Sequence, residues 1–449
     1  MDFKRKKLSI VTLGCQMNRH DSEWIAGLLA DEYDVTGDEA EADLLVVNTC
    51  AVRDKAEQKF FSLMGRLRPL KAGKRDMVIG VAGCVAQEQG EQIIKRQPLV
   101  DIVFGTKAVE KLPSLLKKFE ETGRPQVDVS AESDYDEYPM KRESAVSAWV
   151  SIMRGCGNHC SYCIVPSTRG AEQSRPMESI LAEIRDLAEK GYKEITLLGQ
   201  NVNSYGAGLS QKATFPELLR KADAIMAGHG GGWLRFVTSH PKDLSDDLIA
   251  AMAELESVCP ALHLPIQSGS DRILAAMRRG YTAERYFERV ENLRRKIPDL
   301  ALTSDVIVGF PGETQEDFEA TLKAVEQAEY DNIFLFKYSP REGTDATKLP
   351  GRVDANTARE RFDAVMDIQR DITRRRYESW TGKEITALTD GPSKRDPLRY
   401  SARTPQNITV NFGADMDFTG SFIRARIIKA KRYSLDGSIN GQLSQRQAR

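Results

Sequence analysis

Three cysteines each directly follow a short apolar run that is rich in β-branched residues, and this placement limits the possible folds. These strand-end cysteines and the runs before them are LSIVTL (8–13) with Cys15, LLVVNT (44–49) with Cys50, and MVIGVAG (77–83) with Cys84. Helix-like stretches separate the runs, and IVFGT (102–106) is a fourth, which is typical of a doubly wound parallel sheet. Ligands bind at the carboxyl ends of strands in such sheets, so we expect the three cysteines to meet at one edge. The alternative is three unrelated core cysteines, since single buried cysteines are common.

A second series of strand-like runs alternates with amphipathic, helix-like stretches. These runs are AWVSIMR (148–154), EITLLGQ (194–200), WLRFVTS (233–239), ALHLPIQ (261–267), LTSDVIVGF (302–310) and NIFLFKY (332–338). Six βα repeats are too few for a closed eight-stranded barrel, so we predict an open, partial (βα)6 barrel. Its active site should lie at the carboxyl ends of the strands. Three further cysteines, here called the loop cysteines, directly follow the first of these strands and are Cys156, Cys160 and Cys163.

The loop cysteines form a CxxxCxxC motif, which offers three ligands and not four. Thiolates hold the iron of cubane clusters, and three thiolates on a four-iron cluster leave one iron open to a ligand that is not protein. A structural zinc site needs a fourth ligand, and the local candidate is His159. Its position beside Cys160 makes joint coordination awkward. Tyr162 is placed to pack against a bound adenine, and the alternative is a plain core tyrosine.

The cysteine content favours free thiols over disulfide bonds. The chain of 449 residues has seven cysteines, an odd number, and KRKK (4–7) is followed by only a short apolar run and no cleavage site. No apolar stretch approaches the roughly 20 residues that span a bilayer. We therefore expect a cytoplasmic protein with no membrane segment, whose thiols are available for metal.

Charge is distributed unevenly along the chain. From Arg374 to Arg449 there are 15 Lys and Arg against 7 Asp and Glu, a net charge of +8, so the rest carries −9. This asymmetry indicates a segment that binds a polyanion, or else a solvated basic surface. The same segment contains four β-like runs that predict a small all-β barrel, and these are EITALTD, RYSARTP, NITVNF and FIRARIIKAKRYSL.

Aromatic residues are interleaved with the basic residues of this segment, as in surfaces that stack unpaired bases. They are Tyr400, Phe412, Phe418, Phe422 and Tyr433, and many of them must instead fill the barrel core. We therefore predict an α/β protein with an N-terminal doubly wound parallel sheet and a C-terminal all-β barrel. The predicted parts are a domain at 1–124, a linker at 125–147, the partial barrel at 148–377, the small barrel at 378–440 and a tail at 441–449.

Many segments resemble the radical S-adenosylmethionine (SAM) superfamily and, within it, the methylthiotransferase family of the MiaB type. The matching segments are LGCQMNRHDSE (13–23), NTCAVRDKAEQK (48–59), GCVAQ (83–87), IMRGCGNHCSYCIVPSTRG (152–170), TLLGQNVNSYG (196–206), TSHPKDL (238–244), HLPIQSGSDRIL (263–274), DVIVGFPGET (305–314) and YSPREGT (338–344). The basic C-terminal segment resembles the TRAM domain, a small β-barrel that binds RNA.

The resemblance implies two 4Fe-4S clusters and two uses of SAM. The loop cysteines would hold the cluster whose open iron binds SAM, and one electron would cleave SAM to methionine and a 5′-deoxyadenosyl radical. The strand-end cysteines would hold an auxiliary cluster that carries the sulfur, which a second SAM methylates. The implied reaction places a methylthio group at C2 of N6-isopentenyl-adenosine next to the anticodon of a tRNA. No catalytic residue beyond the cluster ligands is implied.

The resemblance also implies SAM contacts at the ends of the barrel strands. These are Tyr162, Gly199, Gln200, Asn201, Gln267, Ser268, Gly309 and Pro311, with Ser270 and Gly312 nearby. Glycines at strand ends are equally explained by tight turns. Arg154, Arg169 and Arg175 flank the loop cysteines and would meet phosphate or the SAM carboxylate, or else be surface arginines without a ligand. Cys259 matches no motif and is interpreted as structural.

The implied partners are a tRNA anticodon stem-loop that carries isopentenyl-adenosine and an electron donor of the reductase or flavodoxin type. We expect a monomer. Two other functions stay open: methylthiolation of threonylcarbamoyl-adenosine in tRNA or of a ribosomal protein aspartate, and electron transfer without catalysis. Relatives with the former activities usually differ around Cys15 and in HLPIQSGS, whereas an electron carrier needs fully ligated clusters, which two sets of three ligands do not provide.

Overall fold

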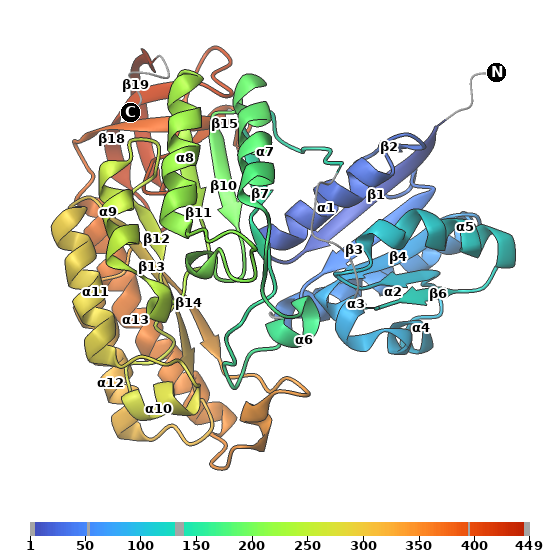
Figure 1. Ribbon diagram of the computed structural model, residues 1–449, viewed down its shortest axis with the longest axis horizontal. Helices are drawn as coiled ribbons and strands as arrows, with labels where there is room; N and C mark the ends of the chain where they lie inside the picture. The colour runs from blue at the N-terminus through green and yellow to red at the C-terminus, as the bar shows by residue number, and fades with distance from the viewer. Residues whose placement is uncertain (1–4, 52–53, 131–138, 394–395, 444–449) are drawn as a thin grey trace. The chain divides into compact units, whose positions relative to one another are not determined.

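The structure is a computed structural model that describes residues 5–51, 54–130, 139–393 and 396–443 (Figure 1). The described chain divides into two compact units. The first unit contains the residues up to Glu143 together with 153–158 and 164–179, and the second contains 144–152, 159–163 and the residues from Ile180 on. No helix in these ranges combines the length and hydropathy that a bilayer-spanning segment needs.

The first unit is built on a six-stranded sheet in which all neighbouring strands are parallel. In order across the sheet the strands are β2 (Tyr33–Val35), β1 (Lys6–Leu13), β3 (Leu44–Thr49), β4 (Val78–Gly83), β5 (Ile102–Phe104) and β6 (Gln126–Asp128). The order reverses at β1 and β3, which is the switch point where doubly wound sheets bind ligands. The predicted parallel sheet is therefore confirmed.

Helices cover both faces of this sheet because its central strands are apolar on both sides. Leu44 and Val46 of β3 pack with α1 (Gln16–Leu28) and α5 (Leu112–Thr122), which follows the 3-10 turn η1 (Val109–Lys111). Leu45 and Val47 point to the opposite face, as alternation along a strand requires. There they pack with α2 (Asp54–Gly73), α3 (Cys84–Gln89) and α4 (Glu91–Arg96).

The second unit contains six parallel strands that follow one another in chain order. They are β7 (Ser147–Ser151), β10 (Glu194–Leu198), β11 (Trp233–Phe236), β12 (Ala261–His263), β13 (Ala301–Val308) and β14 (Asn332–Lys337). A parallel bridge between Leu234 and Val258 joins β11 to the segment before β12. Among the described residues β7 and β14 have no pairing with each other, so the barrel is open, as the six repeats predict.

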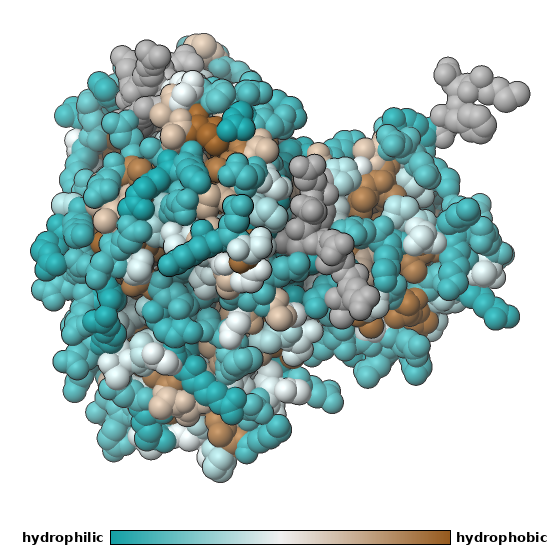
Figure 2. Space-filling view, in the orientation of Figure 1, coloured by the Kyte–Doolittle hydropathy of each residue, from teal (hydrophilic) through white to brown (hydrophobic). Residues whose placement is uncertain are grey.

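Helices follow the barrel strands and bury their outer face. They are α7 (Met177–Glu189), α8 (Phe215–Gly228), α9 (Asp246–Glu254), α10 (Asp271–Ala276), α11 (Ala283–Lys296), α12 (Gln315–Ala328) and α13 (Ala355–Glu378). Short elements occupy the loops: β8 (Met153–Arg154), α6 (Val165–Arg169), β9 (Gln173–Ser174), η2 (Val202–Ser204), η3 (Pro241–Asp243) and η4 (Asp345–Lys348). Polar side chains cover most of the surface in Figure 2, and hydrophobic ones form small scattered groups.

Five strands near the C-terminus close into a small barrel in the order β15-β16-β17-β19-β18. They are β15 (Glu384–Pro392), β16 (Arg399–Arg403), β17 (Thr409–Gly413), β18 (Phe422–Ala430) and β19 (Leu435–Leu443). Phe412 and Phe418 lie in its core. Phe422 packs instead with Trp233 and Cys259 of the open barrel that contains β7 to β14, here called the half-barrel. The half-barrel and the small barrel therefore share a buried contact. The predicted all-β barrel is confirmed.

Element boundaries differ from the predicted ones at three places. Strand β6 lies inside the predicted linker 125–147, because Gln126–Asp128 pairs with β5. The linker residues 131–138 lie outside the described residues. The run 422–435 is not one strand, since β18 ends at Ala430 and β19 begins at Leu435 and extends into the predicted tail.

Candidate functional site

The structure brings the three strand-end cysteines together at the carboxyl edge of the first sheet. Cys50 donates its backbone N–H to the Leu13 carbonyl at 2.9 Å, which places it beside the end of β1. Its thiol is hydrogen-bonded with those of Cys15 and Cys84. Cys50 and Cys84 are buried, and Cys15 is partly exposed. Three thiols thus converge on one place from three different strands.

A glycine before Cys15 and another before Cys84 allow this close approach. A Cβ atom on Gly14 would lie 2.9 Å from the Cβ of Cys50. Gly83 has φ of +89° and ψ of −160°, a conformation that is almost restricted to glycine. A Cβ there would also clash with the Thr49 carbonyl on the neighbouring strand. The GC pairs in LGC and AGC are thus a local signal for the site.

Two buried asparagines form a hydrogen-bonded network beside the strand-end cysteines. The Asn18 side-chain oxygen accepts from the Cys15 N–H at 3.2 Å and lies 3.3 Å from its sulfur. The Asn18 amide donates to Asn48 Oδ1 at 3.0 Å, and the Asn48 amide returns a 2.7 Å bond to the Asn18 carbonyl. Ser22 Oγ accepts a further bond from Asn48 at 3.0 Å. This network ties the start of α1 to the end of β3.

A buried ion pair places positive charge near the strand-end thiols. Arg169, at the end of α6, donates to Asp21 on α1 at 2.7 Å. Hydrogen bonding from Cys50, followed by the Arg169 charge, lowers the pKa of Cys15 to about 6 and that of Cys84 to about 6. The same two hydrogen bonds raise the pKa of Cys50, which retains the shared proton. Cys15 and Cys84 therefore favour the thiolate, the form that binds metal.

A 4Fe-4S cluster is the candidate ligand of the trio, because three thiolates would leave one of its irons open. Among the described residues no three His, Cys, Asp or Glu side chains have the arrangement of a one-metal site. A cubane does not require one, because each thiolate binds a different iron. His159, the candidate fourth ligand for zinc, is exposed.

The loop cysteines are held by backbone hydrogen bonds in both units. Cys156 belongs to the first unit, where it donates to the Gly170 carbonyl at 3.3 Å and its sulfur accepts from the Asn158 N–H at 3.4 Å. Cys160 and Cys163 belong to the second unit, and Cys163 donates to the Cys160 carbonyl at 3.0 Å. All three are partly exposed, as cluster ligands that must meet a substrate should be.

Tyr162 packs among apolar side chains at the carboxyl ends of β13 and β14. Its ring meets that of Phe310 edge-on, with 6.5 Å between centroids. The surrounding cluster includes Ile273, Met277 and Ile307. Burial raises the pKa of Tyr162 well above its ordinary value, so it is a neutral phenol. The structure shows the core packing that was one of the two alternatives for Tyr162, and its contact with adenine stays a prediction.

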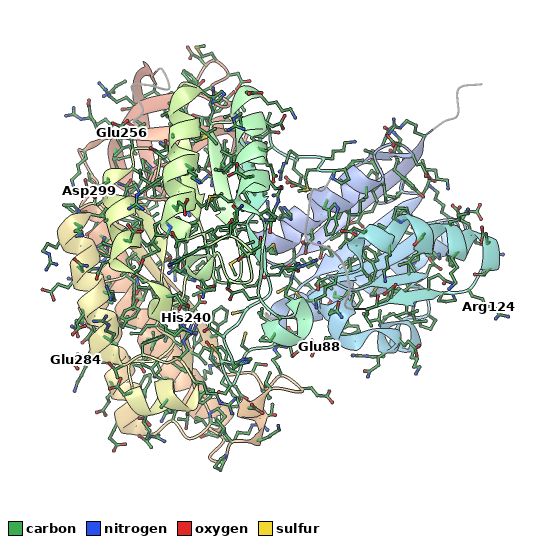
Figure 3. The ribbon with its side chains drawn as sticks, viewed as in Figure 1. Glu88, Arg124, His240, Glu256, Glu284 and Asp299 are labelled. Atoms are coloured by element: carbon green, nitrogen blue, oxygen red, sulfur yellow. The ribbon has the colours of Figure 1, made fainter. Side chains whose placement is uncertain are left out.

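Buried polar atoms without partners gather at the ends of β10 and β11. Within the described chain no hydrogen-bond partner exists for Gln200 Oε1, Asn201 Oδ1, Ser239 Oγ, His240 Nε2 or either amide atom of Asn203. Burial, then the charges of Arg279 and Lys242, lowers the pKa of His240 to about 2, so its imidazole is neutral (Figure 3). Buried polar groups rarely stay unsatisfied. This set therefore fits a polar cofactor, and SAM carries amino, carboxylate and ribose groups of that kind.

The amide nitrogen of Asn201 and several other residues expected at SAM are buried or hydrogen-bonded within the protein. Asn201 donates its amide to Asp243 at 2.7 Å, and Gly199 is buried. Ser268 is fully buried and lies 3.2 Å from Thr321 Oγ1, while Gln267 bridges to Val306 with φ of +70°. Ser270 caps α10.

The glycines after β13 serve a tight turn. Gly309 has φ of +73°, and a Cβ there would lie 2.9 Å from that of Ala358 on α13. Pro311 is buried beside it, and Gly312 also has positive φ. The turn explanation therefore accounts for these positions without a ligand.

The three arginines that flank the loop cysteines are buried. Arg154 is 6% exposed, and Arg169 and Arg175 are each 4% exposed. The surface alternative is therefore wrong for all three. Arg175 donates to Ser179 at 3.1 Å. Cys259 is buried in the contact between the half-barrel and the small barrel, which agrees with a structural thiol.

Sequence reasoning missed Asn18, Asn48, Asp21 and Arg279, which contact the cysteines or their neighbours. Three of them lie inside segments that match the family pattern, so the signal was present. Asn18 contacts Cys15 only three residues away, but the Asn18–Asn48 and Asp21–Arg169 contacts join residues 30 and 148 positions apart, and no local spacing reveals these.

Comparisons with known proteins identify the family of the chain. The model of the radical SAM superfamily matches residues 150–325, and that of uncharacterized protein family UPF0004 matches residues 7–105. A protein of Moorella thermoacetica named tRNA-2-methylthio-N(6)-dimethylallyladenosine synthase is 42% identical over 440 residues, which are 97% of this chain and 98% of that protein. A protein of Caldicellulosiruptor saccharolyticus with the same name is 47% identical over 441 residues, 97% of this chain and 93% of that protein.

Solved structures share the fold at low sequence identity. The radical SAM methyltransferase TsrM from Kitasatospora setae superposes with a TM-score of 0.53 at 14% identity, covering 74% of this chain and 72% of that one. This likeness shows the architecture alone. From the full-length relatives and the two family matches, the chain belongs to the radical SAM methylthiotransferases, in the MiaB-type family of tRNA-2-methylthio-N(6)-dimethylallyladenosine synthases.

Proposed function

We propose that the chain is a tRNA methylthiotransferase that adds a methylthio group at C2 of N6-isopentenyl-adenosine next to the anticodon. The observation that carries this proposal is the pair of separate three-thiol sets, one at the edge of the first sheet and one after the first barrel strand. Each set leaves an iron of a 4Fe-4S cluster without a protein ligand. The names of the relatives supply the substrate.

Each set of three cysteines binds its own cluster. Cys156, Cys160 and Cys163 hold the radical SAM cluster, and the strand-end cysteines hold the auxiliary cluster. When bound, the clusters and SAM supply radical formation, methyl transfer and sulfur insertion. Asn18 and Asn48 hold the strand-end cysteines in place, and the unsatisfied atoms after β10 and β11 receive the polar groups of SAM.

The C-terminal barrel offers a basic surface for the tRNA. Arg424, Arg426 and Lys429 of β18 are exposed. Tyr433 is 61% exposed, with the Arg432 guanidinium carbon 5.0 Å from its ring centre. Of the five aromatics expected at this surface, Phe412, Phe418 and Phe422 are buried, and Tyr400 stacks on Phe412. Tyr433 is therefore the aromatic placed to stack on a base.

The setting of the reaction follows from the same chemistry. Thiol-ligated clusters need a reducing compartment, so we place the enzyme in the cytoplasm. A reductase or flavodoxin-type protein would supply electrons, and the enzyme would act as a monomer.

Anaerobic reconstitution with iron and sulfide, followed by SAM, a reductant and isopentenylated anticodon stem-loop RNA, tests the proposal. Mass spectrometry of the nucleosides should show one added methylthio group, together with 5′-deoxyadenosine. Cys160→Ala should abolish 5′-deoxyadenosine, whereas Cys50→Ala should retain it and lose the methylthiolated product. Cys259→Ala, a buried cysteine outside both sets, should keep both products. Full methylthiolation by Cys50→Ala would refute the auxiliary-cluster role.

Radical formation without a change in this RNA would leave the chemistry in place and remove the substrate. The same assay with RNA that carries threonylcarbamoyl-adenosine would then identify the alternative substrate.

A further inference from the structure

Arg279 is a buried arginine that directly contacts a loop cysteine. Its guanidinium lies 3.3 Å from the Cys160 sulfur and 3.4 Å from the Tyr162 hydroxyl, both through Nη1. Nη2 donates to the Pro265 carbonyl at 3.1 Å, and Nε donates to the Tyr281 hydroxyl at 3.1 Å. Arg279 is 4% exposed. The side chain is therefore fixed on three sides and aimed at Cys160.

No carboxylate neutralises this charge in the described part of the chain. Three other buried arginines there do have one: Arg169 pairs with Asp21 at 2.7 Å, Arg235 with Glu194 at 2.6 Å, and Arg361 with Glu313 at 2.6 Å. The partners of Arg279 are a thiol, two phenols and a carbonyl. A buried charge is costly unless it is paired, so the guanidinium favours a site that brings negative charge close to it.

The turn that carries Cys160 is anchored to the residues just before Arg279. Ser161 donates its N–H to the Met277 carbonyl at 3.1 Å and its hydroxyl to the Ala276 carbonyl at 2.8 Å. Tyr281 braces the guanidinium and lies 2.9 Å from the Ile266 carbonyl. The segment from α10 to Tyr281 therefore fixes both the backbone at Ser161 and the charge at Cys160.

We propose that Arg279 is a positioning residue for the radical SAM cluster, which neutralises the Cys160 thiolate and makes the cluster easier to reduce. Hydrogen bonds to cluster sulfurs and nearby charge are among the factors that set cluster potentials. A cation stabilises the reduced, more negative form, so its loss shifts the potential to more negative values. This inference rests on the proposed assignment of the loop cysteines to the cluster.

The test is a redox titration of the cluster followed by electron paramagnetic resonance. A Cys50→Ala background removes the auxiliary cluster, so that one signal remains. In this background we compare Arg279→Met, Arg279→Lys and Arg278→Met. Arg278 is the matched control, because it is adjacent, exposed and paired with Asp345 at 2.8 Å.

We expect Arg279→Met to make reduction at least tenfold less favourable, which corresponds to about 59 mV for one electron. Arg279→Lys keeps the charge but loses the planar fork, so its shift should be smaller. Arg278→Met should titrate like the parent. Unchanged potentials in iron-loaded Arg279→Met would overturn the proposal.

Iron uptake and unfolding separate a local role from a purely structural one. Loss of iron from both Arg279 variants, with unchanged thermal unfolding of the iron-free protein, would support the positioning role. Thermal unfolding lowered in both variants before iron is added would make Arg279 structural and overturn the proposal. Because no RNA is present, a wrong tRNA substrate leaves the result intact, whereas absence of a cluster in the parent would contradict the proposed function itself.

Discussion

Gly83 shows how one backbone conformation sets the position of a cysteine. Its φ of +89° is costly for any other residue, and a Cβ would also meet the Thr49 carbonyl. Backbone strain of this type costs about 1–3 kcal/mol, and the clash adds to it. We expect Gly83→Ala to lower the urea midpoint of the iron-free protein and to prevent iron from binding at the strand-end cysteines.

Gly123 is the matched control for this change. It also has positive φ, +61°, at the end of α5, but a Cβ there would meet nothing within 4 Å. Gly123→Ala should therefore cost about 1–2 kcal/mol, the usual penalty of the left-handed region. It should leave iron content per chain unchanged. Equal effects of the two substitutions would show that strain alone, and not the approach to Thr49, matters at Gly83.

The strand-end cysteines could be predicted from sequence because their position depends on strand order. Parallel strands place their carboxyl ends at one edge of the sheet. Recognising the three apolar runs as strands was therefore enough to place Cys15, Cys50 and Cys84 together. The Arg279 contact with Cys160 could not be found in this way. The two residues are 119 positions apart and meet because a turn after α10 packs on the loop.

Strands were predictable where they are long and apolar on both faces. β3 matches its predicted range, and β13 begins one residue before and ends two residues before the range predicted for it. β6 was not predicted, because Val127 is its one apolar residue. It is a strand because it pairs with β5. The strands predicted at 194–200 and 233–239 extend beyond the carboxyl ends of β10 and β11. The excess residues leave the sheet and supply the polar groups of the site.

Strands β12 to β14 present a mixed polar and aromatic face on the side away from the helices. His263 Nε2 lies 3.5 Å from Asp305, and the His263 ring meets Phe334 edge-on at 5.7 Å. Phe334 is 45% exposed, although Ile333 beside it is buried. Ile307, two residues beyond Asp305, packs in the cluster that contains Tyr162. This face therefore lies next to the expected SAM site.

We expect this face to bind the adenine that is modified. Exposed aromatics stack on unpaired bases, and a carboxylate accepts from the N6–H of adenosine. Phe334→Ala should weaken binding of the isopentenylated stem-loop by about 1–3 kcal/mol, the usual contribution of one stacked base. Formation of 5′-deoxyadenosine without RNA should stay unchanged. Fluorescence anisotropy measures the binding.

Lys337→Met provides the control for Phe334, since Lys337 is an exposed residue of the same strand. It should keep the affinity of the parent. Parental affinity in Phe334→Ala would place the base elsewhere. Asp305→Asn should also lower the preference for isopentenyl-adenosine over unmodified adenosine, but by less than Phe334→Ala does. The amide oxygen of the new asparagine can still accept a hydrogen bond from N6–H.

The small barrel is attached to the half-barrel by buried charges that no local pattern reveals. Glu194 of β10 accepts from Arg235 at 2.6 Å and lies 3.0 Å from Arg403 of the small barrel. Arg235 also donates to the Thr404 and Pro405 carbonyls, at 2.8 and 2.6 Å. Its two carbonyl partners are about 170 positions away in sequence. Sequence analysis could therefore predict each barrel but not the contact between them.

Glu194→Gln should weaken this contact, because Arg235 then lacks a counter-charge. Removal of one partner from a buried pair costs about 3–5 kcal/mol. Burial acts to raise the pKa of Glu194, but Arg235 and Arg403 outweigh it and hold the pKa below 4.5. The stabilisation is therefore complete above pH 4.5 and is lost as the pH falls through the lowered pKa.

Urea unfolding of the parent and of Glu194→Gln, followed by tryptophan fluorescence, measures this dependence. Trp233 reports on the contact, since its ring lies 5.0 Å from that of Phe422. The difference between the two proteins should be constant from neutral pH down to 4.5 and should shrink in stronger acid. Glu284→Gln, on the exposed first turn of α11, should match the parent throughout (Figure 3). A difference that is independent of pH would mean that Glu194 acts through its shape and hydrogen bonds and not through its charge.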